Sequence, residues 1–176
     1  MSLRKFYADV RAATKSDLLL INIKWFLLNH SMHLLFLYRL GQDLYRVRYI
    51  GKVLGYILEY LIRVVYSSDM SCRADIGEGV VIVHGHDIVI GADVIIGRNC
   101  KIFNGVTLGN KDIKKSSYGN QPVIGDNVVL STGAKVLGKV NLGDNVIVGA
   151  NSVVVKDVPA DSVVAGVPAK IIRDNQ

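Results

Sequence analysis

Residues 124–154 have the sequence IGDNVVLSTGAKVLGKVNLGDNVIVGANSVV, in which an aliphatic side chain returns at every sixth position. These aliphatic positions are Ile124, Leu130, Val136, Leu142, Val148 and Val154. Four residues after most of them stands a second, usually small residue, and Gly, Asn or Asp cluster in between. Such residues tolerate the positive φ of a tight corner, which a β-branched residue does not. The period therefore predicts one short strand and one corner in every repeat.

The same period extends toward the N-terminus. Its further aliphatic positions are Ile76, Ile82, Ile90, Ile96, Ile102 and Leu108. A six-residue repeat is typical of a parallel β-helix, in which three hexapeptides form one triangular coil of about 18 residues. The aliphatic side chains then fill the interior of the prism. We therefore expect a mainly β protein whose β-helix covers residues 69–157.

Two interruptions of the period are candidate functional segments, because irregular loops on a regular scaffold often carry function. The first adds two residues after Ile82, within Val83-His84-Gly85-His86-Asp87. The second is a protruding loop over residues 110–123, which contains three lysines and Tyr118. After Asp157 the pattern dissolves, so residues 158–176 are interpreted as a C-terminal tail.

The segment 1–68 has a different pattern. Apolar residues recur there at three- and four-residue steps, which predicts α-helices. Gly41, Gly51 and Gly55 are the expected breaks between them. The stretch 18–40 is apolar but includes Lys24 and Arg39 among other polar residues, so packed or peripheral helices are favoured over a membrane-spanning one.

The net charge of +6 lies wholly in this helical segment. Residues 1–66 contain ten Lys and Arg against four Asp and Glu, whereas the remainder contains eleven of each. A basic surface of this kind is either simply solvated or attracted to an anionic membrane or substrate. Peripheral membrane association through these helices is thus one expectation, and no nucleic-acid partner is expected.

Two isolated cysteines bear on the cellular compartment. Cys72 and Cys100 lack any CxxC spacing, which favours free thiols in a reducing environment. The N-terminus shows no apolar run typical of a signal peptide. We expect a cytoplasmic protein, with the inner face of the membrane as a place of attachment.

The sequence resembles the hexapeptide-repeat acyltransferases, and among them the serine acetyltransferase-like branch. The similarity covers residues 69–172, and the helical segment resembles a shortened form of that branch's N-terminal domain. The motifs that carry it are Asp69 eight residues before Gly77, the His84 bulge, the string Gly105-Val106-Thr107-Leu108-Gly109, the loop closed by Pro122, and Ala165-Gly166-Val167-Pro168-Ala169-Lys170. The resemblance implies a left-handed β-helix, a homotrimer, and acetyl-CoA bound in a groove between two prisms.

The resemblance also implies roles for individual residues. His84 would be the general base and Asp69 the carboxylate that orients it. The residues implied along the coenzyme A path are Gly109, Thr132, Ala150 and Lys170. The residues expected at the acceptor are Asp17, Val83, Gly85, His86 and Gln121. No metal is expected.

The chemistry of these residue types agrees with such a reaction. An alcohol attacks a thioester at neutral pH only with help from a base, and histidine has the appropriate intrinsic pKa. A carboxylate on the far ring nitrogen fixes the tautomer. Asp69 precedes His84 by slightly less than one coil, so the two could lie one layer apart. Backbone N–H groups near Gly85 are candidate donors to the oxyanion.

Two acceptors compete within this interpretation. Serine acetyltransferases have an aspartate directly before the catalytic histidine and an Arg-His-Pro string at the end of the loop. This chain has Val83 and Asn120-Gln121-Pro122 instead. Both changes remove charge that a zwitterionic amino acid would need, although Asp17 could meet its amine. The sequence therefore favours a sugar hydroxyl of a surface polysaccharide or glycan, with L-serine as the alternative.

Two other functions fit the fold less well. A zinc-dependent carbonic anhydrase on a β-helix needs three histidine ligands, and the repeats contain only His84 and His86. A non-catalytic binding or scaffolding module would be marked by loss of the catalytic histidine, whereas His84 is present.

Overall fold

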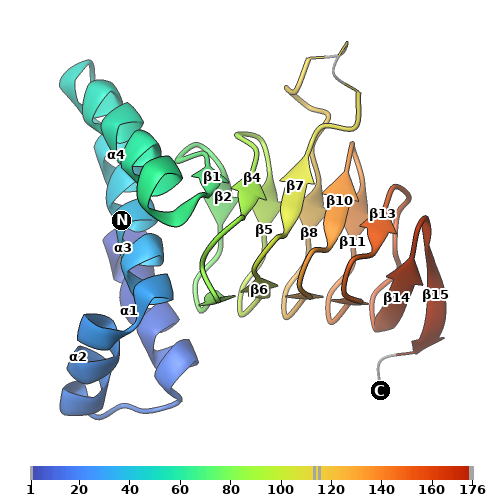
Figure 1. Ribbon diagram of the computed structural model, residues 1–176, viewed down its shortest axis with the longest axis horizontal. Coiled ribbons are helices and arrows are strands. Elements are labelled where there is room, and N and C mark those ends of the chain that lie inside the picture. Colours follow the sequence, from blue (N-terminus) through green and yellow to red (C-terminus); the bar gives the residue numbers. More distant parts are fainter. Residues whose placement is uncertain (1, 113, 115, 175–176) are drawn as a thin grey trace.

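The computed structural model describes residues 2–112, 114 and 116–174, and it has a helical part and a three-sided prism. Figure 1 shows the helices gathered at one end of the prism, with the C-terminus at the other. The helices are α1 (Ser2–Thr14), α2 (Leu19–Leu28), α3 (His30–Tyr45) and α4 (Ile50–Tyr66). Within the described residues, no helix is both long and apolar enough to cross a membrane.

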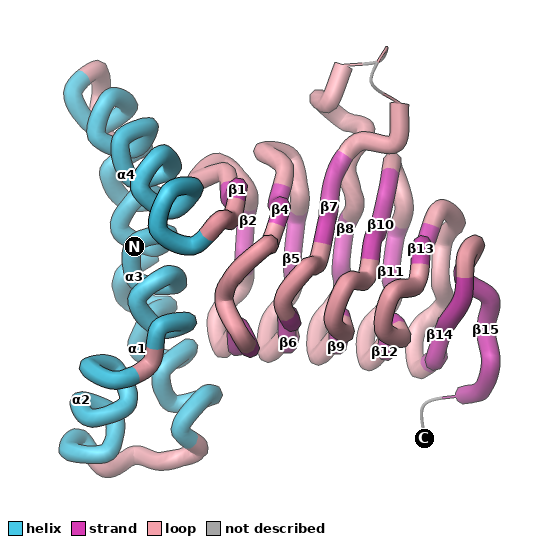
Figure 2. Tube along the Cα trace, in the orientation of Figure 1, coloured by secondary structure: helices cyan, strands magenta, loops and turns pink. Residues whose placement is uncertain are grey.

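The prism consists of short strands separated by corners, as Figure 2 shows. The strands are β1 (Asp69–Met70), β2 (Asp75–Ile76), β3 (Val81–Val83), β4 (Val89–Ile90), β5 (Ile95–Ile96), β6 (Lys101–Phe103), β7 (Thr107–Gly109), β8 (Val123–Ile124), β9 (Val129–Leu130), β10 (Lys135–Leu137), β11 (Asn141–Leu142), β12 (Ile147–Val148), β13 (Val153–Val154), β14 (Ser162–Gly166) and β15 (Ala169–Asp174). They form three sheets in the orders β1-β4-β7-β10-β13, β11-β8-β5-β2 and β15-β14-β12-β9-β6-β3. All neighbours are parallel except β14 and β15, which confirms the expected parallel β-helix.

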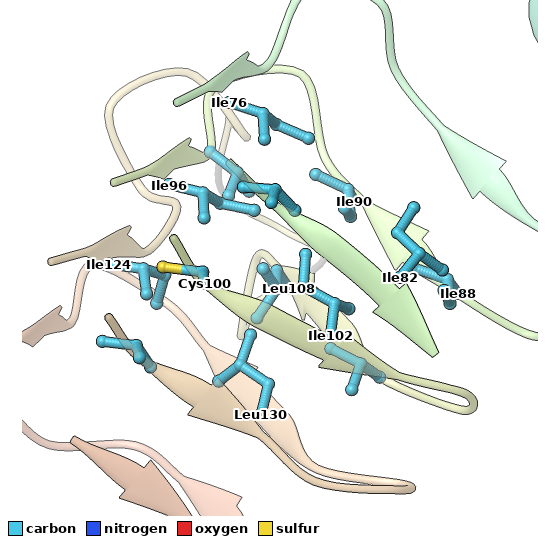
Figure 3. Packing of buried hydrophobic residues seen from close by; sticks show 14 of the residues in the cluster. Ile76, Ile82, Ile88, Ile90, Ile96, Cys100, Ile102, Leu108, Ile124 and Leu130 are labelled. Carbon is cyan, nitrogen blue, oxygen red and sulfur yellow. The ribbon is translucent and has the colours of Figure 1, made fainter. Parts of the chain in front are cut away.

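The aliphatic positions of the repeat fill the prism. Every one of the twelve positions quoted above is at most 3% exposed, and Figure 3 shows several of these side chains stacked in the interior. Cys100 lies among them. Because each coil contributes similar side chains at similar places, burial of apolar area is the main stabilising term along the whole prism.

The strand register locates both interruptions. Strands of the same sheet in successive coils normally pair residues 18 apart, as Val89 pairs with Thr107. Asp69 instead pairs with Val89, 20 residues away, and Thr107 pairs with Lys135, 28 residues away. The coil that contains His84 is therefore two residues longer than the standard coil. The later one is ten residues longer, and in Figure 2 the extra chain projects from the prism between β7 and β8.

A buried ion pair fastens the helices to the first coil. Arg39 of α3 donates from Nε to the Asp9 carboxylate of α1 at 2.9 Å, and both side chains are 0% exposed. Arg39 also donates to the backbone oxygens of Ile76 and Gly77, at 2.8 and 2.5 Å. Asp9 accepts from the Val80 N–H at 3.0 Å. These bonds join two helices to one corner of the prism and so fix where the N-terminus of α3 lies.

Two details of the helical part and the tail differ from expectation. Gly41 and Gly55 lie inside helices, so the prediction that they mark breaks was wrong, whereas Gly51 is the second residue of α4, directly after the break at 46–49. The role of Gly41 and Gly55 is close packing, since a Cβ at Gly41 would lie 2.3 Å from the sulfur of Cys72 and one at Gly55 2.5 Å from the Tyr45 ring. The tail after residue 157 is also more regular than expected, because β14 continues one sheet of the prism in parallel with β12.

Candidate active site

The two extra residues of the first long coil are His84 and Gly85. Val83 still pairs with Phe103, 20 residues later, as in the long coil. The next hydrogen bond between corners joins the Gly105 N–H to the His86 oxygen, and its spacing is the same as that between Asn151 and Thr132 in a standard coil. The two extra residues therefore lie between Val83 and His86. His84 has a φ of 56°, in the left-handed region that is uncommon for residues other than glycine. A non-glycine residue held there is often functional, because the surrounding structure must maintain the strain. The candidate base thus occupies a bulge that the following coils lack.

The N-terminus of α3 holds this bulge. The Gly85 N–H donates to Ser31 Oγ at 2.9 Å, and both residues are buried. Asn29 caps the helix by accepting from the Met32 N–H. A Cβ at Gly85 would lie 2.9 Å from Leu34, so α3 packs directly on the bulge. Since the Gly85 N–H is already bonded to Ser31, it is not the free oxyanion donor that the sequence suggested.

A hollow of about 520 Å³ opens beside the bulge, between the helices and β3. Its lining consists of Ala13, Trp25, Leu28, Asn29, His30, Ser31, Met32, Val81, Ile82, Val83, His84 and His86. Among the described residues that line it there is no Asp, Glu, Lys or Arg. The space beside His84 is therefore lined by aliphatic, aromatic, amide, hydroxyl and imidazole groups.

Three imidazoles line this hollow, those of His30, His84 and His86. The ring of His30 lies 5.8 Å from that of His86, edge to face, and 4.5 Å from the ring of Tyr66. His30 thus supplies the third histidine that the repeats lack. Even so, the described part of the chain contains no group of three or more His, Cys, Asp or Glu residues placed to hold a metal ion.

Asp69 lies one layer from the bulge in the first strand of the prism. Its N–H donates to the Ile88 oxygen at 2.8 Å, and Ile88 in turn donates to Ser68 Oγ. The Asp69 carboxylate is 55% exposed and accepts from Arg63 at 2.7 Å. The backbone therefore brings Asp69 to the same coil edge as His84, while its side chain is directed to Arg63 of α4.

The corners that follow the bulge are stacked in one column along an edge of the prism. Backbone hydrogen bonds join each corner to the one before it: the N–H groups of Gly105, Gly133 and Asn151 donate to the oxygens of His86, Asn104 and Thr132, respectively. Thr132 and Ala150 occupy this column, and Lys170 lies near its far end, where β15 pairs with β14. An extended ligand could follow this edge from the end of the prism to His84. Gly109 lies elsewhere, where the protruding loop leaves β7.

Two residues expected at the acceptor lie away from His84 in the single chain. Asp17 forms an ion pair with Arg11 and lines a hollow of about 450 Å³ with Glu78 and Asn99. Gln121 is buried, accepts from the Asp93 N–H at 2.8 Å, and lines a hollow of about 380 Å³. Of the expected acceptor residues, Val83 and His86 line the hollow of the bulge.

Sequence reasoning missed the helical side of this site. The sequence singled out none of His30, Ser31, Trp25 and Asn29 as site residues. Their place at the site does not follow from the local sequence pattern, because they reach the bulge only through the docking of α3 on the first coil. The one available signal was the polar cluster Asn29-His30-Ser31 at the start of an otherwise apolar helix.

A parallel β-helix of hexapeptides with a histidine-bearing bulge defines the class of hexapeptide-repeat transferases. Residues 121–156 match the family described as bacterial transferase hexapeptide (six repeats). The serine acetyltransferase of Helicobacter pylori is 38% identical over 155 residues, which cover 87% of this chain and 88% of that protein. This chain belongs to that family, in its serine acetyltransferase-like branch.

Solved structures agree with this assignment. The crystal structure of Neisseria gonorrhoeae serine acetyltransferase has a TM-score of 0.88 at 32% identity, over 99% of this chain and 67% of that one. The Brucella abortus serine acetyltransferase in complex with coenzyme A has a TM-score of 0.87 at 28% identity, over 99% of this chain and 68% of that one. Other relatives are longer: the chain spans 54% of the Synechococcus elongatus serine acetyltransferase, at 40% identity over 77% of this chain.

Proposed function

We propose that this protein is an acetyl-CoA-dependent O-acetyltransferase in which His84 is the general base. The observation that carries the proposal is the bulge itself: two inserted residues place a strained histidine at a hollow, at the head of a continuous edge of stacked corners. The relatives named serine acetyltransferase, one of them solved with coenzyme A, support the choice of acetyl-CoA as donor.

The proposed reaction needs one proton carrier. The His84 imidazole takes the proton from the acceptor hydroxyl as that oxygen bonds to the thioester carbonyl carbon. The tetrahedral intermediate then breaks its C–S bond, and the imidazolium returns the proton to sulfur, so that coenzyme A leaves as a thiol. Asp69, one layer away, would position the ring. This requires its carboxylate to release Arg63 and to accept a hydrogen bond from the imidazole instead.

L-serine is the acceptor that we propose first. The sequence favoured a sugar hydroxyl, but the comparisons favour the alternative, because the similar proteins and structures are named serine acetyltransferases and one structure is of the Neisseria gonorrhoeae enzyme in complex with serine. Asp17 remains the candidate partner for the amine of a serine, although in one chain it lies away from His84.

A sugar hydroxyl is the second candidate, and one observation favours it. The described lining of the hollow at His84 offers imidazole, amide, hydroxyl and aromatic groups but no charged side chain. A zwitterion would leave both of its charges without a partner there, whereas a sugar needs only hydrogen bonds and an apolar wall.

Acceptor-dependent release of the coenzyme A thiol separates these two candidates. We expect turnover with acetyl-CoA and L-serine at a kcat/KM above that for every nucleotide sugar and oligosaccharide in a panel. A higher kcat/KM with a glycan would favour the second candidate. Absence of acceptor-dependent release with the whole panel would contradict the proposed enzyme.

We further propose a homotrimer, because one chain does not assemble the whole expected site. Asp17 and Gln121 line hollows other than that of His84, so only a neighbouring chain could bring copies of them to it. Val89, Ile95 and Val123 on the flanks of the prism are 37–46% exposed and are available for such a contact. Light scattering should give three times the mass of one chain; a monomeric mass would contradict this assembly.

The role of His30 leads to a separate prediction. His30→Ala should raise the acceptor KM by about 5–10-fold, the equivalent of one lost hydrogen bond, with little change in kcat. His33→Ala is a matched control, because His33 packs against Phe26 instead of lining the hollow. An unchanged KM in the His30 variant would show that this imidazole does not contact the acceptor.

The cytoplasm is the compartment that we propose. Cys72 and Cys100 are both buried and free, and burial raises their pKa values to about 12 and about 11. Such thiols stay protonated and unreactive at neutral pH, as expected for packed cysteines under reducing conditions.

A further inference from the structure

The outward face of α4 is an apolar surface of unusual extent. Its members, which we call the α4 apolar face, are Ile50, Val53, Leu54, Ile57, Tyr60, Leu61, Val64 and Val65. Each of them is between 41% and 72% exposed. They recur at three- and four-residue steps, so they form one continuous stripe along the helix. None of the members is charged, which is uncommon for the surface of a helix in water.

The opposite side of α4 already accounts for its attachment to the rest of the protein. Gly51, Gly55, Ile62 and Tyr66 are buried there, and the two glycines let the helix pack closely on Tyr45 and the end of α3. Figure 1 shows α4 extending away from the prism at the end opposite the C-terminus. The α4 apolar face is therefore not needed for the packing of this chain.

The charge of the helical part indicates what kind of partner binds this face. Each of the four acidic residues of segment 1–66 already has a partner. Asp9 binds Arg39, Asp17 binds Arg11, Asp43 accepts from the N–H groups of Ser2 and Leu3, and Glu59 accepts from the Cys72 N–H. Within the described residues 2–66, the basic side chains of Arg4, Lys15, Lys24, Arg48 and Lys52 form no ion pair. The surface of the helical part therefore presents uncompensated positive charge.

We propose that the α4 apolar face docks on an anionic lipid bilayer, with α4 lying in the plane of the membrane surface. Amphipathic helices bind in this way when an apolar face is flanked by Lys or Arg. Arg48 directly precedes the helix, Lys52 lies in its first turn on the polar side, and the phenols of Tyr56 and Tyr60 suit the headgroup level. The helical segment of a second copy is a poorer occupant, because each acidic residue of segment 1–66 already has a partner and offers these basic side chains no free carboxylate.

The hollow at His84 lies beside the buried side of α4. Tyr66, the last residue of α4, lies against the ring of His30 at 4.5 Å, and the chain then enters β1 at Asp69. Because Tyr66 belongs to the buried side of α4, a lipid-bound protein would hold its site on the side of the helix that faces away from the bilayer. The proposal does not depend on the identity of the acceptor.

Vesicle sedimentation of the full-length protein tests the docking. At low salt we expect binding to vesicles of phosphatidylcholine with phosphatidylserine and much weaker binding to phosphatidylcholine alone. Val53→Glu combined with Ile57→Glu should lower the partition coefficient at least tenfold, because two carboxylates would enter the interface. Arg48→Gln and Lys52→Gln should each lower it roughly fivefold, and added salt should act in the same direction.

Matched controls separate docking from misfolding and self-association. Ile171→Glu combined with Ile172→Glu introduces the same two charges at exposed isoleucines of β15, far from the helices, and should leave vesicle binding unchanged. Circular dichroism and acceptor-dependent CoA release without lipid should stay normal in the α4 variants. No binding of the unmodified protein to anionic vesicles, or equal binding by the double variant, would overturn the proposal. A change of oligomeric mass in the double variant without a change in lipid binding would assign the face to a second copy.

Discussion

Replacement of His84 by alanine should lower kcat by about 10²–10⁴, the usual contribution of general acid–base catalysis. The reason is geometric as well as chemical. His84 stands in a two-residue bulge with a φ of 56° and lines the hollow beside α3. Its side chain is exposed, so its removal should not disturb the interior of the prism. Steady-state release of coenzyme A would measure the loss.

Two comparisons make this result specific. His33→Ala, in the same helical wall but outside the hollow, should keep kcat within a few-fold of the unmodified protein. The thermal unfolding of the His84 variant should be nearly unchanged, since the exposed imidazole makes no buried contact and alanine is no better suited than histidine to a φ of 56°. A folded His84→Ala protein that turns over at a near-normal rate would remove this residue from the mechanism.

Loss of the guanidinium in Arg39→Ala should reduce the free energy of unfolding by about 3–5 kcal/mol, the cost of leaving a buried charge without its partner. Asp9 and Arg39 are both 0% exposed, and Arg39 also satisfies two backbone oxygens of the first coil. Burial raises the pKa of Asp9 even with the attraction of Arg39 that lowers it. Without Arg39 that pKa must rise further.

The direction of the pH effect follows from this shift. A carboxyl group whose pKa is higher in the folded than in the unfolded state stabilises the fold only at low pH, and that stability is lost as the pH rises. The stability difference between Arg39→Ala and the unmodified protein should therefore be smaller at acidic than at neutral pH. Urea denaturation at both pH values measures it.

An exposed pair provides the control for this experiment. Arg63→Ala breaks the pair with Asp69, in which both side chains are more than half exposed, and should change stability far less. Combining Arg39→Met with Asp9→Asn should recover part of the loss, because no unpaired charge remains. Equal effects of Arg39→Ala and Arg63→Ala would show that the buried pair does not fasten the helices to the prism.

The prism could be predicted from the sequence because its determinants are local. Each repeat carries its own aliphatic side chain and its own corner residues, so the period alone defines the coils and reveals the insertion at His84. The stacking of Thr132 and Ala150 on one edge follows from the same arithmetic. The family resemblance added the roles that were expected of these residues.

The helical wall of the site could not be predicted in the same way. Ser31 meets Gly85 across 54 positions in the sequence, and Arg39 meets Ile76 across 37. Such contacts depend on how helices dock on a coil, which no repeat encodes. Gly41 and Gly55 were misinterpreted for the same reason: their role is close packing against residues distant in the sequence.

The most direct test of the account is detection of the acetylated product by mass spectrometry, with purified protein, acetyl-CoA and L-serine. The account predicts O-acetylserine in amounts equal to the coenzyme A released, from the unmodified protein but not, on the same timescale, from His84→Ala. Product formation at equal rates by both proteins would contradict the assignment of the base. Absence of an acetylated product from the unmodified protein with L-serine and with every glycan tested would contradict the proposed function itself.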